Sequence, residues 1–247
     1  MHNTPPSRRR AIMVLSPTAM QRVRSEPEGM ILQRTEGLTL TSVDHDPANE
    51  GLFVRDGFFA AGHLYLLSPF DTRTYVDASG AYEAFALERQ HHFLRLCQAL
   101  GATSLEVVDV RSIATEDEQK IGVGVEKVVA VKGSVGSKQT EQLVRTLRTK
   151  HTFPGGAPDL AHAQKILDQT ALSGDLEFTA LLDLRRGHNP LRSHEFDLTV
   201  TRSGRQQLKL AASVKVPTYA KLSVDYTTAL KQREECQTRL RLRFDAD

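Results

Sequence analysis

The chain has 247 residues, of which 40% are hydrophobic and 25% charged, the composition of an ordinary globular protein that can build its own core. The net charge of +2 is too small to indicate a nucleic-acid or membrane partner by itself, and two cysteines exclude a disulfide framework, so a reducing cytoplasm is the expected location. No run of about 18 apolar residues is present, which argues against a transmembrane helix.

Residues 1–28 are rich in proline, arginine and serine, and we expect them to form a flexible basic N-terminal arm. Their one apolar run, Ala11 to Leu15, is ended by Pro17 and is shorter than the roughly 7–15 residues of a secretory signal core. No linker interrupts the remaining sequence, so residues 29–247 are predicted to form a single α+β domain.

The segment after the arm is predicted to contain short strands. "GMILQRTEGLTLTSV" indicates strands around Gly37. "GLFVRDGFFAAGHLYLLSPF" indicates a pair of strands with a turn near Asp56 and Gly57.

The first main helix is predicted over about residues 80–100. Asp77 or Ser79 can cap its start, and Gly101 supplies a left-handed stop. A buried strand from Leu105 to Val110 follows. The apolar side chains at helical spacing are Tyr82, Phe85, Ala86, Phe93, Leu96, Cys97 and Leu100.

The second half is predicted to be rich in strands, with a second main helix at about 158–172. Apolar and polar residues alternate over 196–201, 208–216, 222–230 and 239–244, which favours antiparallel strands with one buried face. The expected fold is therefore α+β, with a twisted, mostly antiparallel sheet of long strands and two main helices.

"VAVKGSVGSKQTEQLVRTL", residues 129–147, comes close to a phosphate-binding loop. Gly133 and Gly136 are too close together, and Lys138 is displaced with no hydroxyl residue behind it. We interpret the stretch as two strands joined at Gly136. Its second part also fits a helix, because Leu143 and Leu147 share helical spacing, but its threonines and arginines favour a strand.

No residue is predicted to be catalytic, and we expect neither a metal nor a cofactor. The histidines are scattered, and Cys97 lies on an apolar helix face as a buried thiol. Glu106 and Asp109 could serve a nucleic-acid-processing enzyme. Their spacing of three places them on opposite sides of a regular strand, which disfavours that use.

The order of segments over residues 123–244 resembles the pore-forming domain of gasdermins. The resemblance rests on "VAVKGSVG", "KQTEQLVRTLRTK", the helix "DLAHAQKILDQ", "LEFTALLDL" read as an apolar strand, and two late hairpin-like stretches. These stretches are "HEFDLTVTRSGRQQLKLAASVKV" and "AKLSVDYTTALKQREECQTRLRLRF". A cysteine lies near the tip of the late hairpin in gasdermins, and Cys236 falls at a comparable place.

The resemblance implies a cytoplasmic protein that moves to acidic membranes on activation, oligomerises and inserts amphipathic β-hairpins. Gly133 and Gly136 would act as hinges, and Cys236 would be a modification site. Leu208, Leu210, Val214, Leu222 and Val224 would face lipid, and Thr199, Thr201, Ser213 and Thr227 would face water. The residues expected to bind anionic headgroups are Lys209, Lys215, Lys221, Arg239, Arg241 and Arg243.

The sequence thus predicts a pore-forming, cell-death or toxin-like protein without enzymatic activity. Its partners would be anionic lipids, further copies of itself and an inhibitory protein. Two alternatives stay open: a non-catalytic scaffold that offers its strands to a partner, and a nucleic-acid-processing enzyme.

Overall fold

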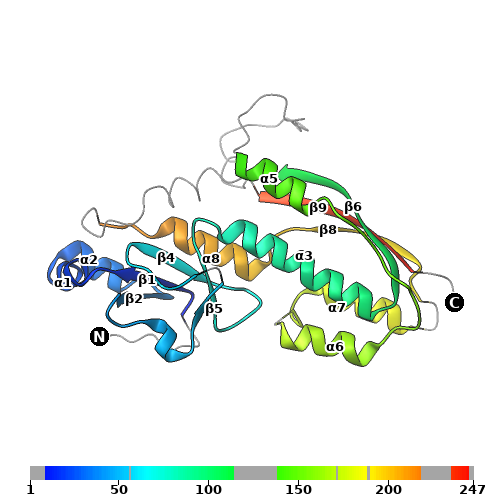
Figure 1. Ribbon diagram of the computed structural model, residues 1–247, viewed down its shortest axis with the longest axis horizontal. Coiled ribbons are helices and arrows are strands. Elements are labelled where there is room, and N and C mark those ends of the chain that lie inside the picture. The colour runs from blue at the N-terminus through cyan, green and yellow to red at the C-terminus, as the bar shows by residue number, and fades with distance from the viewer. Residues whose placement is uncertain are drawn as a thin grey trace. The chain divides into compact units, whose positions relative to one another are not determined.

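The computed structural model describes residues 9–55, 57–113, 138–170, 172–187, 190–217 and 235–244. The protein has an α+β fold, as the sequence predicts, with two separate sheets (Figure 1). The chain divides into two compact units where we expected one domain. Unit 1 comprises Met1–Ala86 and Thr201–Gln232, and unit 2 comprises Leu87–Val200 and Arg233–Asp247.

Unit 1 is built on a five-stranded mixed sheet with the strand order β2-β1-β4-β5-β3. Strand β4 is antiparallel to both of its neighbours, β1 and β5, whereas β2 runs parallel to β1 and β3 parallel to β5. The strands are β1 (Ala11–Leu15), β2 (Leu38–Ser42), β3 (Phe53–Val54), β4 (His63–Leu67) and β5 (Thr74–Asp77).

The expected N-terminal arm differs from the structure over the part that is described. Residues Ala11–Leu15 form an inner strand, β1, and all five are buried. A short, uninterrupted apolar run is typical of a strand buried on both faces, which is the physical reason for the difference. Helix α1 (Pro17–Ser25) follows directly, with the Ser16 hydroxyl accepting a hydrogen bond from the Ala19 amide.

A second helix of unit 1 begins within the expected arm and extends into a segment that was expected to be a strand. Residues Pro27–Gln33 form helix α2, and a Cβ at Gly29 would lie 2.2 Å from the Val23 carbonyl oxygen of α1, so only glycine fits there. A short 3₁₀ helix, η2, spans Pro47–Glu50. The expected pair of strands around Asp56 is wrong, because β3 pairs with β5 and not with β4.

Helix α8 (Arg202–Ser213) is the main correction in unit 1, because the alternation over 208–216 predicted a strand. The Thr201 hydroxyl caps the helix by accepting from the Gly204 amide at 3.1 Å. Gly204, Gln207 and Ala211 are buried at helical spacing, and α8 packs on β1 and β4. The sequence pattern of this segment fits both a helix and a strand, and burial of this helix face in the tertiary structure favours the helix.

Unit 2 contains an antiparallel four-stranded sheet with the order β7-β6-β9-β8. Its long central pair is β6 (Ala102–Ile113) and β9 (Glu235–Phe244), and its outer strands are β7 (Lys150–Thr152) and β8 (Ser193–Leu198). The strands predicted at Leu105 to Val110 and 239–244 are confirmed, and the one predicted at 196–201 is confirmed over 196–198, where β8 ends.

Helices cover one face of this sheet (Figure 1), and they include both main helices predicted from the sequence. These are α3 (Ala81–Ala99), which begins in unit 1, and α6 (Leu160–Gln169). The expected strands at residues 139–147 and 176–184 are wrong, because α5 (Lys138–Leu147) and α7 (Leu176–Arg186) are helices. Leu143 and Leu147 are buried at helical spacing, as are Phe178, Leu181 and Leu182.

The core of unit 2 forms where α3 and α7 meet the sheet. The centre of the Phe93 ring on α3 lies 5.3 Å from the centre of the Phe178 ring and 5.2 Å from that of the Phe196 ring. Both contacts are edge-to-face. Gly101 ends α3 with a φ of 78°, as predicted. A Cβ at Gly101 would also lie 2.1 Å from the Gly156 carbonyl oxygen. Both the positive φ and this close approach therefore require glycine at position 101.

Candidate functional site: the charged face of the second sheet

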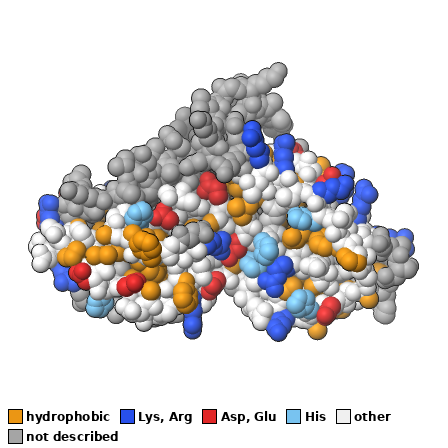
Figure 2. Space-filling view, viewed as in Figure 1, with side chains coloured by type: hydrophobic (Ala, Val, Ile, Leu, Met, Phe, Trp, Pro, Cys, Tyr) orange, Lys and Arg blue, Asp and Glu red, His pale blue; other side chains and the backbone are white. Residues whose placement is uncertain are grey.

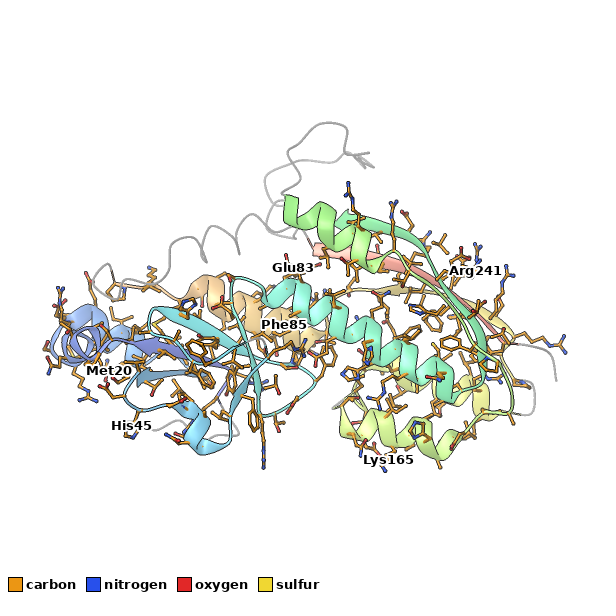
Figure 3. All side chains as sticks on the ribbon, in the orientation of Figure 1. Met20, His45, Glu83, Phe85, Lys165 and Arg241 are labelled. Atoms are coloured by element: carbon orange, nitrogen blue, oxygen red, sulfur yellow. The ribbon has the colours of Figure 1, made fainter. Side chains whose placement is uncertain are left out.

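Strand β9 separates its side chains by chemistry. Leu240, Leu242 and Phe244 are buried against the helices, whereas the arginines that alternate with them, Arg239, Arg241 and Arg243, point to the opposite face of the sheet. In Figure 3, Arg241 lies on the side of the sheet away from α3. The three arginines that alternate with apolar residues over 239–244 therefore lie on one face of a strand, as the sequence predicts, and this strand belongs to unit 2.

Carboxylates on β8 pair with two of these arginines. Arg239 Nε donates to Asp197 Oδ1 at 3.0 Å, and its Nη2 donates to Oδ2 at 3.3 Å. Arg241 Nε donates to Glu195 Oε1 at 2.9 Å. The hydrogen bond and the charge of Asp197 raise the pKa of the Arg239 guanidinium. Both arginines are thus partly neutralised within the sheet.

Strand β6 supplies carboxylates on the other side of β9. Glu106 lies opposite Arg241, and Asp109 lies opposite Arg239. The expectation that these two carboxylates face opposite sides of the sheet is wrong, because the register shifts between Val107 and Asp109. A bulge adds a residue to one strand and so reverses the side on which the following side chains lie.

The side of the sheet that carries these ion pairs is called the charged face here. Across the strands, one row reads Lys150, Glu106, Arg241 and Glu195, with alternating sign. Figure 2 shows basic side chains gathered over this part of unit 2. The charged face comprises Lys150, Arg239, Arg241, Arg243, Glu106, Asp109, Glu195 and Asp197, four bases and four acids.

Arg243 differs from the other two arginines. Its neighbours across the strands are Ser104 on β6 and Ser193 on β8, neither of which carries a charge. Its side chain is exposed. Arg243 is therefore the arginine of β9 whose charge is least compensated by its cross-strand neighbours.

Lys209 and Lys215, which the sequence also predicts to bind lipid, do not lie on this face. Lys209 is on helix α8 of unit 1, and Lys215 lies just beyond that helix. The expectation that both belong to a strand is wrong. Lys221 and the hinge residues Gly133 and Gly136 lie outside the described residues. Cys236 belongs to β9 and lies opposite Ser112, and only its backbone is among the described parts of the chain.

An ionic cluster that sequence analysis missed surrounds Arg89, which is only 5% exposed. Its Nη2 donates to Asp175 Oδ2 at 2.9 Å and to Glu177 Oε2 at 2.7 Å, and its Nη1 donates to the Thr199 carbonyl. Arg89 thus connects α3 to the start of α7 and to the end of β8. The available signal was an arginine at helical spacing between the apolar residues Phe85 and Phe93.

A second polar cluster lies in unit 1, where the end of β5 lies beside the start of β4. His63 Nδ1 lies 2.6 Å from Asp77 Oδ2, and Ser79 donates to Oδ1 of the same carboxylate. Burial is the largest influence on Asp77 and raises its pKa, but the hydrogen bonds from Ser79 and His63 together outweigh it. The pKa of Asp77 therefore lies below its ordinary value of 3.8. In many enzymes the histidine that acts as a general base is held in orientation by a carboxylate in this way.

Among the residues that the structure describes, no group of three or more His, Cys, Asp or Glu side chains is placed to hold a metal ion. None of the described helices is both long enough and apolar enough to cross a bilayer. Comparison of the chain with known protein families, curated proteins and solved structures finds no match.

Proposed function

We propose that the protein is a membrane-targeting, pore-forming protein of gasdermin-like type that oligomerises and inserts amphipathic β-hairpins. The observation that carries the proposal is the division of β9 into a buried apolar side and a charged side, in antiparallel pairing with β6. Strand β6 has 12 residues and β9 has 10, and a tilted strand needs about 9–11 residues to cross a bilayer.

The charged face suits a water-filled pore better than it suits lipid. Its arginines and carboxylates are matched across the strands, so the ion pairs can persist when the sheet moves. In the inserted state, lipid tails would replace α3 and α7 on the apolar side of the sheet. The proposal therefore assigns Arg239 and Arg241 to the pore lining in place of the headgroup contact expected from the sequence.

Initial attraction to anionic lipid needs basic groups that are not already paired within the sheet. Arg243 meets this description, and Lys209 and Lys215 are exposed in unit 1. Each such group is worth about 1 kcal/mol near an anionic surface. Under this proposal the protein is cytoplasmic until activation, when it moves to the membrane, and an inhibitory partner restrains it until then.

Residues 202–213 do not support the proposal, although the sequence suggested an inserting strand there. They form helix α8, and their apolar residues pack in unit 1. The proposal rests on β6, β8 and β9 alone.

Release of a trapped dye from vesicles tests the proposal. The protein should release dye from equimolar phosphatidylserine and phosphatidylcholine vesicles, and less from phosphatidylcholine alone. Reversal of Arg239, Arg241 and Arg243 to glutamate should reduce release. A matched reversal of Arg95, Arg186 and Arg192, exposed bases of the same unit, should leave it intact. No release under proteolytic, acidic or oxidative treatment would overturn the proposal.

The scaffold alternative draws support from the free outer edges of β7 and β8 in the described part of the sheet. It predicts a stable complex with another protein and no association with vesicles. Vesicle binding in a flotation experiment separates the two functions directly.

A further inference from the structure

The sheet of unit 2 has two outer strands whose directions are complementary. Every neighbouring pair in the order β7-β6-β9-β8 is antiparallel, so β7 and β8 run in opposite directions. No described strand pairs with the outer edge of either one. A second sheet of the same kind can therefore continue the first, β7 beside β8, without a break in the antiparallel alternation.

The hydrogen bonds of β8 show which of its backbone groups face outward. The Phe244 amide donates to the Arg192 carbonyl at 2.8 Å, which marks these residues as a hydrogen-bonded pair. Hydrogen-bonded and non-hydrogen-bonded pairs alternate along an antiparallel ladder. The backbone N–H and C=O groups of Ser193, Glu195 and Asp197 therefore point away from β9.

The same reasoning applies to β7. The Phe153 amide donates to the Thr103 carbonyl at 2.8 Å, and the Val107 amide donates to the Thr149 carbonyl at 3.0 Å. The groups of Lys150 and Thr152 consequently point away from β6. Both side chains are exposed and lie on the charged face, as do those of Ser193 and Glu195.

We infer that β8 of one copy pairs with β7 of a second copy, with Glu195 opposite Lys150 and Ser193 opposite Thr152. One antiparallel register satisfies both pairs, and it brings together residues whose backbone groups all face outward. The alternating row Lys150, Glu106, Arg241, Glu195 then continues into the Lys150 of the next copy with the correct sign. Opposite charges directly across a strand pair stabilise it, whereas like charges destabilise it.

This contact joins two different edges, so each copy keeps one edge free for a further copy. The inference rests on the proposed function, for which it names the surface through which copies assemble. Unpaired strand edges of this kind readily accept another strand.

Charge reversal in the full chain tests the pairing, with chemical cross-linking on equimolar phosphatidylserine and phosphatidylcholine vesicles as the readout. Glu195→Lys would place lysine opposite lysine between copies, and Lys150→Glu would place glutamate opposite glutamate. Each variant alone should lose cross-linked oligomers by at least about tenfold. An equimolar mixture of the two should regain them, because alternation of the variants places a lysine opposite a glutamate at every contact.

Four controls separate pairing from misfolding. Ser193→Pro and Thr152→Pro each remove one outward N–H without touching the ladder inside the sheet, and both should reduce oligomers. Lys165→Glu and Asp168→Lys, reversals of exposed residues on α6, should not. Circular dichroism confirms the fold of each variant.

The outcomes distinguish this inference from the proposed function. Failure of the mixture to recover oligomers, or a wild-type chain that stays monomeric on vesicles, overturns the pairing. Dye release that is indifferent to all four edge variants overturns the pairing and leaves the pore-forming proposal standing. Oligomers that are lost in the single charge variants and recovered in the mixture, without any dye release, support the pairing and overturn the pore-forming proposal.

Discussion

Arg89 on α3 and Glu177 on α7 form an ion pair between a buried guanidinium and a carboxylate that is 43% exposed, with 2.7 Å between Nη2 of the arginine and Oε2 of the carboxylate. Asp175 accepts from the same Nη2 and also caps α7 through the Glu177 amide. The guanidinium lies 5.6 Å from the centre of the Phe178 ring. One side chain therefore fixes the start of α7 against α3, next to the apolar face of the sheet.

Replacement of Arg89 by methionine should lower the free energy of unfolding by about 1.5–3 kcal/mol, because it removes the charged hydrogen bonds to Asp175 and Glu177, whose side chains keep part of their contact with water. Urea denaturation followed by circular dichroism measures the loss. Arg95→Met on an exposed position of the same helix is the control, and it should change stability by less than about 0.5 kcal/mol. Equal midpoints for the two variants would show that the cluster does not hold α7.

The same cluster predicts a pH dependence. Burial raises the pKa of Glu177 above its ordinary value of 4.5, and the charge of Arg89 offsets only part of that effect. The folded state therefore binds this proton more readily than the unfolded state does. The stabilising contribution of protonated Glu177 is present below pH 4.5 and is lost as the pH rises through the folded pKa.

Glu177→Gln isolates this contribution, because glutamine cannot ionise. The variant should gain stability relative to the wild type as the pH rises from below 4.5 to neutral. Parallel urea titrations over this range measure the difference. A difference that stays constant with pH would mean that Glu177 titrates alike in both states.

The His63 and Asp77 pair predicts a dependence of opposite sign. The pKa of Asp77 lies below its ordinary value of 3.8, so its ionised form stabilises the fold above that pH. This stability is lost as the pH falls through the folded pKa. Asp77→Asn should thus destabilise the protein at neutral pH by about 1–2 kcal/mol, and the difference should shrink in acid. A difference that grows in acid would contradict this account.

The sequence identified elements whose pattern fits only one structure. The apolar side chains of α3 recur at helical spacing over 19 residues, and β9 alternates arginine with leucine or phenylalanine. Both elements form where the sequence predicts them. Helix α8 was missed because Leu208, Leu210 and Val214 alternate like a strand. Its real buried positions are Gly204, Gln207 and Ala211, and tertiary packing selects them.

The candidate site was predictable only in part, for a related reason. The alternation places Arg239, Arg241 and Arg243 on one face, but their partners Glu195 and Asp197 come from a strand more than 40 positions earlier. The bulge on β6 that brings Asp109 to this face is a property of strand register. The arginines of the charged face could therefore be predicted from local sequence pattern, whereas their carboxylate partners are determined by strand pairing.

Arg243 offers the sharpest test of lipid attraction, because serines and not carboxylates flank it across the strands. Arg243→Glu should weaken binding to phosphatidylserine-containing vesicles by about thirtyfold, since removing one positive charge and adding a negative one costs about 2 kcal/mol near an anionic surface. Vesicle flotation measures the change, and circular dichroism should find the fold intact. Arg241→Glu is the contrasting variant: it places three carboxylates side by side with Glu106 and Glu195, so its main effect should be a lower melting temperature. If Arg243→Glu binds these vesicles as tightly as Arg95→Glu, the anionic surface is not recognised by β9, and Lys209 and Lys215 become the basic groups to test next.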